Sequence, residues 1–450
     1  MSANDLHVDR IIAGIPGRKV PMPAAAAGFL GMALGVVGVG YGFAMGETAW
    51  TWGAILVGLV YTMNLAMGGV MFSVILTLTK AHWGRPLKRL AEVFGLFLPV
   101  AYLMLLVFLL FGNGLYAWNP TPFEGIPAQD IAPHGTFAWS TKPFWLSKWT
   151  FIGRQAVAML VLFGLGLAYI RTSLVPDLVQ AKAQLGDKAP ALWNALIGGK
   201  TNVAAAVESS KKTQQVLGGI LAWSYALLFS LMAFDLLMSL SPWWFSNMFG
   251  AWHGVSSVWV TMAWLGIVAL LGGEWLGIRH LITKKLTHDL GMLCLAGCMF
   301  WAYTSYAQLL PIYYANMPEE TDYLLVRLML PQWSWLARTV GVMCFVIPFT
   351  ILLSRGIKKM KWPFIGVLSI IAVGIFLERT LVVMPSVYFG DEFPVLNFVI
   401  ISLGVWFGFL GLFFTVVTQA LAKLPPVTTS DECLAPHPWD VHVHSLDAHH

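Results

Sequence analysis

Six ionisable side chains stand out because they occur inside otherwise apolar stretches of this sequence. They are three arginines, two carboxylic acids and one histidine: Arg154, Asp235, His253, Arg338, Glu378 and Arg379. An ionised side chain at the centre of a membrane-spanning helix costs about 2.5–3.5 kcal/mol, so such groups usually pair, face a protein interior or line a polar path. A carboxylate or histidine beside an arginine could take protons from a lipophilic carrier such as a quinol, if a lipid-accessible pocket adjoins it. An internal salt bridge between two helices explains the same residue types equally well.

The spacing of four of these residues repeats along the chain. Five residues separate Trp149 from Arg154 and Trp333 from Arg338, and seven separate Asp235 from Pro242 and Glu378 from Pro385. Because an offset of four apolar runs relates the two sets, the spacing predicts an internal repeat in which each arginine pairs with the carboxylate of its own set. Chance is the alternative, since no longer stretch aligns.

A second set of polar residues occurs in the apolar runs. Some lie at the ends of the runs opposite to the six ionisable residues, and others lie between those ends and the six. Together its members could form a proton path, whereas each one alone is explained as a helix cap or as an interfacial residue. The candidates for the path are Asn64, Glu92, Glu274, His288, Asp289 and Tyr303.

Composition places these side chains in a membrane. Of the 450 residues, 58% are hydrophobic and 11% are charged, and the mean hydropathy is +0.71, whereas a soluble domain usually carries about a quarter charged residues. Ten apolar runs are long enough to span a bilayer as helices, and they lack the alternation that barrel strands need. The runs lie at 24–45, 51–79, 91–117, 149–171, 213–240, 248–274, 288–316, 332–354, 362–384 and 395–421.

The distribution of basic residues predicts the orientation. The two tails and the even-numbered loops hold 21 of the 27 Lys and Arg residues, and the odd-numbered loops hold three, Lys142, Lys148 and Arg327. Positive residues near the ends of spans are retained in the cytoplasm. We therefore expect both termini to be cytoplasmic and the six intramembrane ionisable residues to lie in the outer leaflet.

The expected fold is an all-α integral membrane domain over residues 24–421, between cytoplasmic tails at 1–23 and 422–450. The repeat predicts two four-helix bundles, helices 2–5 and 6–9, flanked by helices 1 and 10. Residues 1–20 are polar and charged, so no cleavable signal peptide is expected before the first span.

The sequence offers no pattern for a bound redox centre or a metal site. A di-haem cytochrome of the b type needs paired histidines inside facing helices, and only His253 lies well within a run. No haem-attachment or iron–sulfur spacing occurs among the four cysteines. The C-terminal tail holds one cysteine and several histidines, and we expect disorder there rather than a metal site; these residues are Cys433, His437, His442, His444, His449 and His450.

The odd-numbered loops are acidic and aromatic, and we expect them to face an extracytoplasmic partner protein. The alternative is that they are ordinary solvated loops. The segment 118–148 should be ordered by the same contact, because a connection of about thirty residues is usually functional or disordered. The acidic residues concerned are Glu124, Asp130, Glu319, Glu320, Asp322, Asp391 and Glu392.

Predicted helices five to nine contain a series of distinctive short motifs. They are Asp235, Met238–Ser239–Leu240, Pro242, Trp244–Phe245–Ser246, Phe249–Gly250, His288–Asp289–Leu290–Gly291, Phe300–Trp301–Ala302–Tyr303, Tyr314–Ala315–Asn316–Met317–Pro318–Glu319–Glu320–Thr321 and Glu378–Arg379. These segments resemble a known family, the polysulfide reductase (NrfD-like) superfamily, and in particular the second NrfD-like membrane subunit of alternative complex III. The likeness is faint before helix five.

The resemblance implies a ten-helix subunit of a bacterial inner-membrane quinol:cytochrome c (or other acceptor) oxidoreductase. It also implies an extracytoplasmic iron–sulfur subunit, multihaem and monohaem cytochromes c and a second NrfD-like subunit as partners, which would carry the haems and clusters. In that family the other NrfD-like subunit is the better candidate for the quinol site, which would leave this chain a scaffolding or proton-conducting role. Ser241 and Trp243 stand where an acid and a histidine are expected, and Met292 where a lysine is expected.

Two hypotheses of different class follow. The first is a respiratory-chain subunit that offers a quinone-accessible surface or a proton path, binds no redox centre covalently and works in electron transport with its partners. The second is a secondary transporter whose two bundles rock around the outer arginine and carboxylate groups. A transporter should work alone, whereas a complex subunit should co-purify with cytochromes.

Overall fold

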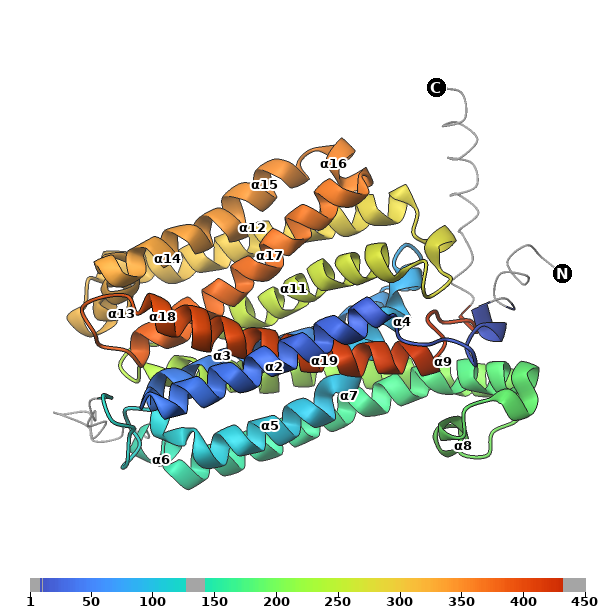
Figure 1. Cartoon of the computed structure of the whole chain (residues 1–450), viewed down its shortest axis with the longest axis horizontal. Coiled ribbons are helices and arrows are strands. Elements are labelled where there is room, and N and C mark those ends of the chain that lie inside the picture. The colour runs from blue at the N-terminus through green and yellow to red at the C-terminus, as the bar shows by residue number, and fades with distance from the viewer. Residues whose placement is uncertain (1–8, 10, 127–141, 432–450) are drawn as a thin grey trace.

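The chain folds as a set of long, nearly parallel helices (Figure 1). The structure is a computed structural model that describes residue 9 and residues 11–126 and 142–431. In these residues ten helical segments are long and apolar enough to cross a membrane, and each corresponds to one predicted run. No β-strand occurs in the described part of the chain. The protein is therefore a multi-pass membrane protein, as the sequence predicts.

The spans are built from single helices or from helices joined by a short 3₁₀ or π turn. In chain order they are α2 (Met22–Ala44), α3 (Thr48–Leu78), α4 (Arg85–Phe94) with α5 (Leu98–Phe111), α7 (Lys148–Leu185), α9 (Val203–Ser224) with α10 (Ser230–Leu236), α11 (Phe249–Gly272), α12 (Lys284–Ala315), α14 (Pro331–Gly341) with α15 (Ile347–Leu352), α17 (Lys361–Val383), and α18 (Val395–Asn397) with α19 (Gly404–Lys423). The short helices α6 (Lys142–Trp145), α8 (Leu192–Ile197), α13 (Pro318–Leu328) and α16 (Arg355–Lys359) lie between them.

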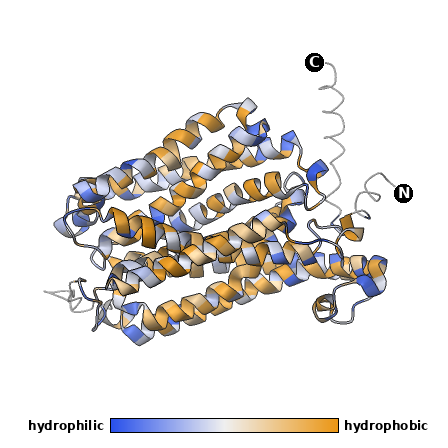
Figure 2. Cartoon of the chain, viewed as in Figure 1, coloured by the Kyte–Doolittle hydropathy of each residue, from blue (hydrophilic) through white to orange (hydrophobic). Residues whose placement is uncertain are grey.

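Hydrophobic residues cover the lengths of the helices, and hydrophilic residues gather at the two ends of the molecule (Figure 2). One end carries α8 and the start of α4, and the other carries α6, α13 and α18 (Figure 1); they are called here the α8 end and the α13 end. Large apolar side chains such as Phe29 and Val36 stay exposed along the helices. Lipid is the solvent that suits such a surface.

Two central helices organise the packing. α3 is buried on nearly all sides. It contacts α11, most of which is also buried. α3 also contacts α4, α5 and α9, and α7 contacts α5 and α9. α11 contacts α12 and α17. α15 packs against α12, and α14 packs against α17.

The first and last spans form a tight pair. Glycines of α2 face glycines of α19, and a Cβ atom on Gly35 would lie only 2.6 Å from the Cα of Gly408. Small residues at such positions let two membrane helices approach closely and gain dispersion energy. The glycine spacing in these two runs therefore fixes α2 against α19.

Two segments differ from the sequence-based expectation. α7 continues to Leu185, well past the predicted end at residue 171, because polar residues carry the helix on after the apolar run stops. The segment after Met317, predicted as a loop, forms the helix α13, which begins with Pro318 at a position where a missing N–H costs nothing. Residues 127–141, within the loop predicted to contact a partner, lie outside the described residues, as does the His-rich tail from 432 onward.

Candidate functional site

A buried ion pair on α17 forms the centre of the candidate site. Glu378 and Arg379 are 2% and 0% exposed, and Nη1 of Arg379 donates to Oε2 of Glu378 at 2.5 Å. The other carboxylate oxygen, Oε1, accepts a hydrogen bond from the indole N–H of Trp301 on α12 at 3.2 Å. Both oxygens of Glu378 are thus held by side chains that the fold positions before any ligand enters.

The arginine of this pair reaches into the centre of the molecule. Its Nη2 donates to the hydroxyl of Ser256 on α11 at 2.5 Å, and its guanidinium lies 5.0 Å from the ring centroid of Trp252. The amide of Asn64 on α3 fits its neighbours when its nitrogen donates to Nε2 of His253 at 3.0 Å and its oxygen accepts from Nε of Arg379 at 3.3 Å. The structure thereby joins Asn64 and His253 to Glu378 and Arg379.

An apolar pocket of about 360 Å³ borders this ion pair near the α13 end. Its walls come from α12, α13, α14, α17 and the start of α11, and most of them are aromatic or aliphatic. Glu378, Trp301, Ser305 and Gln308 supply polar atoms along the wall. Tyr306, which also lines the pocket, is 60% exposed, so the pocket reaches the outer face of α12. A mostly apolar cleft with a few convergent polar groups is the usual form of a small-molecule site.

Stacked rings set the shape of one wall. The rings of Trp244 and Tyr323 lie parallel with centroids 3.8 Å apart, and the guanidinium of Arg327 lies 3.5 Å from the Tyr323 ring centroid. Arg327 donates to the carbonyl of Val382 at 2.8 Å and to the hydroxyl of Ser386 at 2.6 Å, which ties α13 to α17. Burial lowers the pKa of Arg327, yet an arginine stays charged at neutral pH because its ordinary pKa lies above 12. The indole nitrogen of Trp244 is buried without a hydrogen-bond partner among the described residues.

The first predicted pair, Arg154 with Asp235, is confirmed in the other half of the molecule. Nε of Arg154 on α7 lies 2.7 Å from Oδ2 of Asp235 on α10. Asp235 is 1% exposed and also accepts hydrogen bonds from Gln155 at 2.5 Å and from the indole N–H of Trp145 at 3.1 Å. The pair joins α7 to α10.

The second predicted pair, Arg338 with Glu378, is wrong. Arg338 lies on the exposed side of α14 and donates to the carbonyl and the hydroxyl of Ser334, one turn earlier on its own helix. Leu336 and Val340, on the same helix, are buried. Arg338 follows Leu336 by two residues, which corresponds to a rotation of about 200° around the helix, so its side chain faces away from the buried side. Arg379, the residue next to Glu378, takes the place that Arg338 was predicted to fill.

The candidate proton path is divided among separate places. Glu92 belongs to a buried cluster between α3, α4 and α7, and Glu274 lines a pocket that also contains Arg18 near the α8 end. His288 and Asp289 contact one another at 3.2 Å. Tyr303 is 62% exposed on α12. Of the predicted set, Asn64 is the residue that the structure connects to the ion pair.

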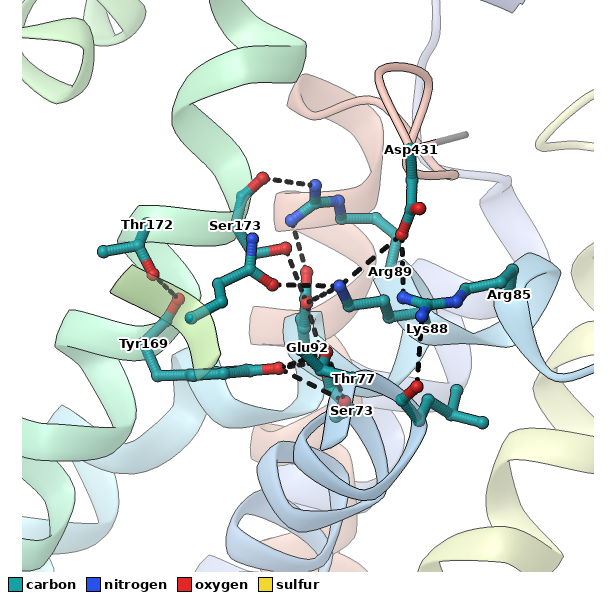
Figure 3. A network of polar contacts seen from close by, with 12 residues as sticks. Ser73, Thr77, Arg85, Lys88, Arg89, Glu92, Tyr169, Thr172, Ser173 and Asp431 are labelled. Atoms are coloured by element: carbon teal, nitrogen blue, oxygen red, sulfur yellow. Dashed lines mark hydrogen bonds and ion pairs between the residues drawn. The ribbon is translucent and has the colours of Figure 1, made fainter. Parts of the chain in front are cut away.

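The cluster around Glu92 contains basic residues that the apolar runs of the sequence place in a predicted cytoplasmic loop. Arg89 binds both Glu92 and Asp177, and all three are 0% exposed. Glu92 accepts hydrogen bonds from the hydroxyls of Ser73 and Ser173, both at 2.7 Å (Figure 3). The spacing of three residues between Arg89 and Glu92 fits one helix face and was a usable signal. Asp177 was hidden in the polar end of α7.

Two of the three residues that depart from the NrfD-like pattern, Ser241 and Met292, have contacts that the structure defines. The hydroxyl of Ser241 lies 3.0 Å from that of Ser386, which itself accepts from Arg327. Met292 lies where a lysine was expected, and the ammonium of Lys358 lies 2.9 Å from its sulfur atom. A lysine from α16 therefore supplies a positive charge beside position 292.

Among the described residues, no group of three or more His, Cys, Asp or Glu side chains could hold a metal ion. Neither the protein-family models nor the curated proteins compared with this chain gave a match. The likeness to the NrfD-like superfamily therefore depends on the short motifs in helices five to nine.

Proposed function

We propose that this chain is a membrane subunit of a respiratory quinol:cytochrome c (or other acceptor) oxidoreductase of the NrfD-like superfamily, and that its aromatic pocket receives the quinol head group. The single observation that carries the proposal is the Glu378 carboxylate in the wall of an apolar pocket of about 360 Å³. Both the size and the apolar walls suit a small aromatic ligand that arrives from the lipid.

The chemistry required of this chain is the acceptance of a proton. Oxidation of a quinol to a quinone releases two protons and two electrons. One hydroxyl proton would pass to the Glu378 carboxylate and the second to water, while both electrons would leave for haems or iron–sulfur clusters on partner subunits. Arg379 and Trp301 hold the two carboxylate oxygens in place. The buried indole N–H of Trp244 is a donor available for the second quinol oxygen.

The same proposal includes the arrangement in the membrane. Two four-helix bundles, α3 to α10 and α11 to α17, are supported by the ring of helix contacts within each set. An orientation with both termini in the bacterial cytoplasm is supported by the 21 basic residues of the tails and even-numbered loops. The pocket would then open in the outer leaflet, beside the acidic segment at Glu320 and Asp322 that is predicted to meet the extracytoplasmic partner.

The test compares two buried carboxylates of the purified assembly. Glu378→Gln leaves the buried Arg379 without its carboxylate, so we expect less assembled subunit. Quinol oxidation per assembled complex is expected to fall at least tenfold. Asp235→Asn is the matched control, because Asp235 is equally buried and arginine-paired but does not line the pocket. We expect it to retain most of the turnover per assembled complex, measured with ubiquinol and menaquinol analogues.

Equal turnover in the wild type and Glu378→Gln would contradict a quinol site at this pocket. A haem-stained native gel tests the wider proposal. A purified subunit that carries no cytochrome partner and transports a solute by itself would replace it with the transporter hypothesis.

A further inference from the structure

A second pocket, at the α8 end, is lined by basic side chains. It has a volume of about 330 Å³ and lies between the end of α3, the start of α4, α7, α9 and the chain segment after α19. Four basic residues line it, Lys80, Arg85, Lys88 and Lys211, together with two carboxylates, Asp177 and Asp431. Behind the pocket, Arg89 binds both Asp177 and Glu92, and Glu92 lies 4.0 Å from Lys88. With these two residues included, five basic side chains face three carboxylates among the described residues, so the excess charge is positive.

The chain places one of its own anions on these cations. The carboxylate of Asp431 lies 2.7 Å from Nη1 of Arg85 and 3.8 Å from Nζ of Lys88 (Figure 3). The neighbouring Ser430 donates its backbone N–H and its hydroxyl to Asp177, at 2.8 and 2.5 Å. The segment after α19 is therefore held in the pocket, and its carboxylate marks where an anion binds.

A further polar group lines the pocket without a protein partner. The hydroxyl of Thr428 is buried, Thr428 being 3% exposed, and it makes no hydrogen bond among the described residues. A buried polar atom without a partner costs free energy, so such atoms usually meet water or a ligand. This observation is independent of the basic side chains.

The surface directly beyond the pocket is apolar. Ile75 and Leu78 on α3, and Val216 and Ile220 on α9, are between 43% and 64% exposed. The two helices adjoin here, since a Cβ atom on Gly218 would contact Leu78 at 3.4 Å. The pocket thus lies where the apolar runs of α3 and α9 end, with an exposed apolar surface on the membrane side that acyl chains could cover.

We propose that this pocket binds the phosphate of an anionic phospholipid, whose acyl chains lie along the junction of α3 and α9. Basic pockets between membrane helices suit such head groups. Lys80 and Lys211 contact the phosphate at the rim, and Asp431 competes with it for Arg85 and Lys88. The inference is independent of the quinol pocket, which lies near the other end of the molecule.

Binding is measured on the full-length protein in mild detergent after removal of endogenous lipid. The probes are dioleoylphosphatidylglycerol, dioleoylphosphatidylcholine and inorganic phosphate, and the readouts are lipid retention in native mass spectrometry and the melting temperature. The test variant is Lys80→Gln with Lys211→Gln, both exposed positions. Its control, Lys200→Gln with Lys212→Gln, removes the same charge from exposed residues that do not line the pocket.

Phosphatidylglycerol should bind the wild type at least tenfold more tightly than phosphatidylcholine. The test variant should lose about tenfold in affinity and the control less than twofold, while Asp431→Asn should gain several-fold because its competing carboxylate is removed. Equal losses in the test and control variants would overturn the proposal, since they indicate attraction to surface charge in general. The lipid would also be rejected as the ligand if inorganic phosphate alone raised the melting temperature and the variants changed that effect in the same way.

Discussion

Each half of the molecule pairs an arginine with a buried carboxylate, and the two pairs form differently. Arg154 and Asp235 are 81 residues apart in sequence and join α7 to α10. Arg379 and Glu378 are neighbours on α17. In both halves a tryptophan indole N–H also donates a hydrogen bond to the carboxylate. The donor is Trp145 in the first half and Trp301 in the second.

The surroundings of the pairs differ more than the pairs do. Asp235 has a further donor in Gln155, and its contacts hold α6, α7 and α10 together. Glu378 forms part of an apolar pocket wall, and its arginine extends to Ser256 and Asn64 at the centre of the molecule. A similar set of charged groups therefore acts as a link between helices in one half and as a polar group beside a cavity in the other.

The largest effect is expected from Arg379→Gln. Removing one partner of a buried ion pair leaves the other charge unpaired, which commonly costs about 3–5 kcal/mol. Arg379 is 0% exposed, so solvent cannot replace it. We expect most of the subunit to be lost from the assembled fraction, as measured by fluorescence-detected gel filtration and thermal unfolding.

Two further variants separate charge from volume. Adding Glu378→Gln to Arg379→Gln should restore much of the assembled protein, because the unpaired carboxylate is then neutral. Arg338→Gln, on the exposed side of α14, should change the melting temperature little. If the double variant were as unstable as the single one, the loss would come from packing and the ion pair would not explain it.

The corresponding change in the first half should be milder. Arg154→Gln leaves Asp235 with two hydrogen-bond donors, Gln155 and Trp145, so we expect a loss of about 1–3 kcal/mol. Asp235→Asn should destabilise more than Asp235→Asn combined with Arg154→Gln, because the single change leaves the arginine without its carboxylate. The measurement is thermal unfolding of all three variants. An additive double variant would mean that the two side chains do not interact in the way their 2.7 Å contact indicates.

Some features of the two halves were predictable from the sequence, and others were not. The ten spans were predictable because lipid exposure requires long apolar runs, and hydropathy reports them directly. The pair of Arg154 with Asp235 was predictable because a buried charge needs a partner at matching depth. Depth alone does not give the rotation of a helix, and so Arg338 was assigned to Glu378 although it faces outward.

The spacing of residues along the sequence could not predict the aromatic pocket. Trp244, Tyr323 and Glu378 come from three distant parts of the chain, and only the packing of α13 against α17 brings them together. The cluster around Arg89 was missed for another reason. Its basic residues were taken as solvated loop charges, whereas α4 begins at Arg85 and turns them toward Asp177 on the extended α7.

The smallest effect, and the finest test of the comparison, comes from the two tryptophans. Trp301→Phe and Trp145→Phe each remove an indole N–H from a buried carboxylate, at 3.2 and 3.1 Å, while keeping an aromatic ring. A hydrogen bond to a charged group contributes about 1.5–3 kcal/mol at most, so both variants should fold with lowered melting temperatures. Their effects on quinol oxidation should differ, because Trp301 lines the pocket and Trp145 does not. We expect Trp301→Phe to lower turnover or raise the KM for quinol several-fold per assembled complex, and Trp145→Phe to leave both near the wild-type values. If the two variants changed stability and turnover alike, the carboxylates of the two halves would have the same role, and Glu378 would then be a structural link like Asp235.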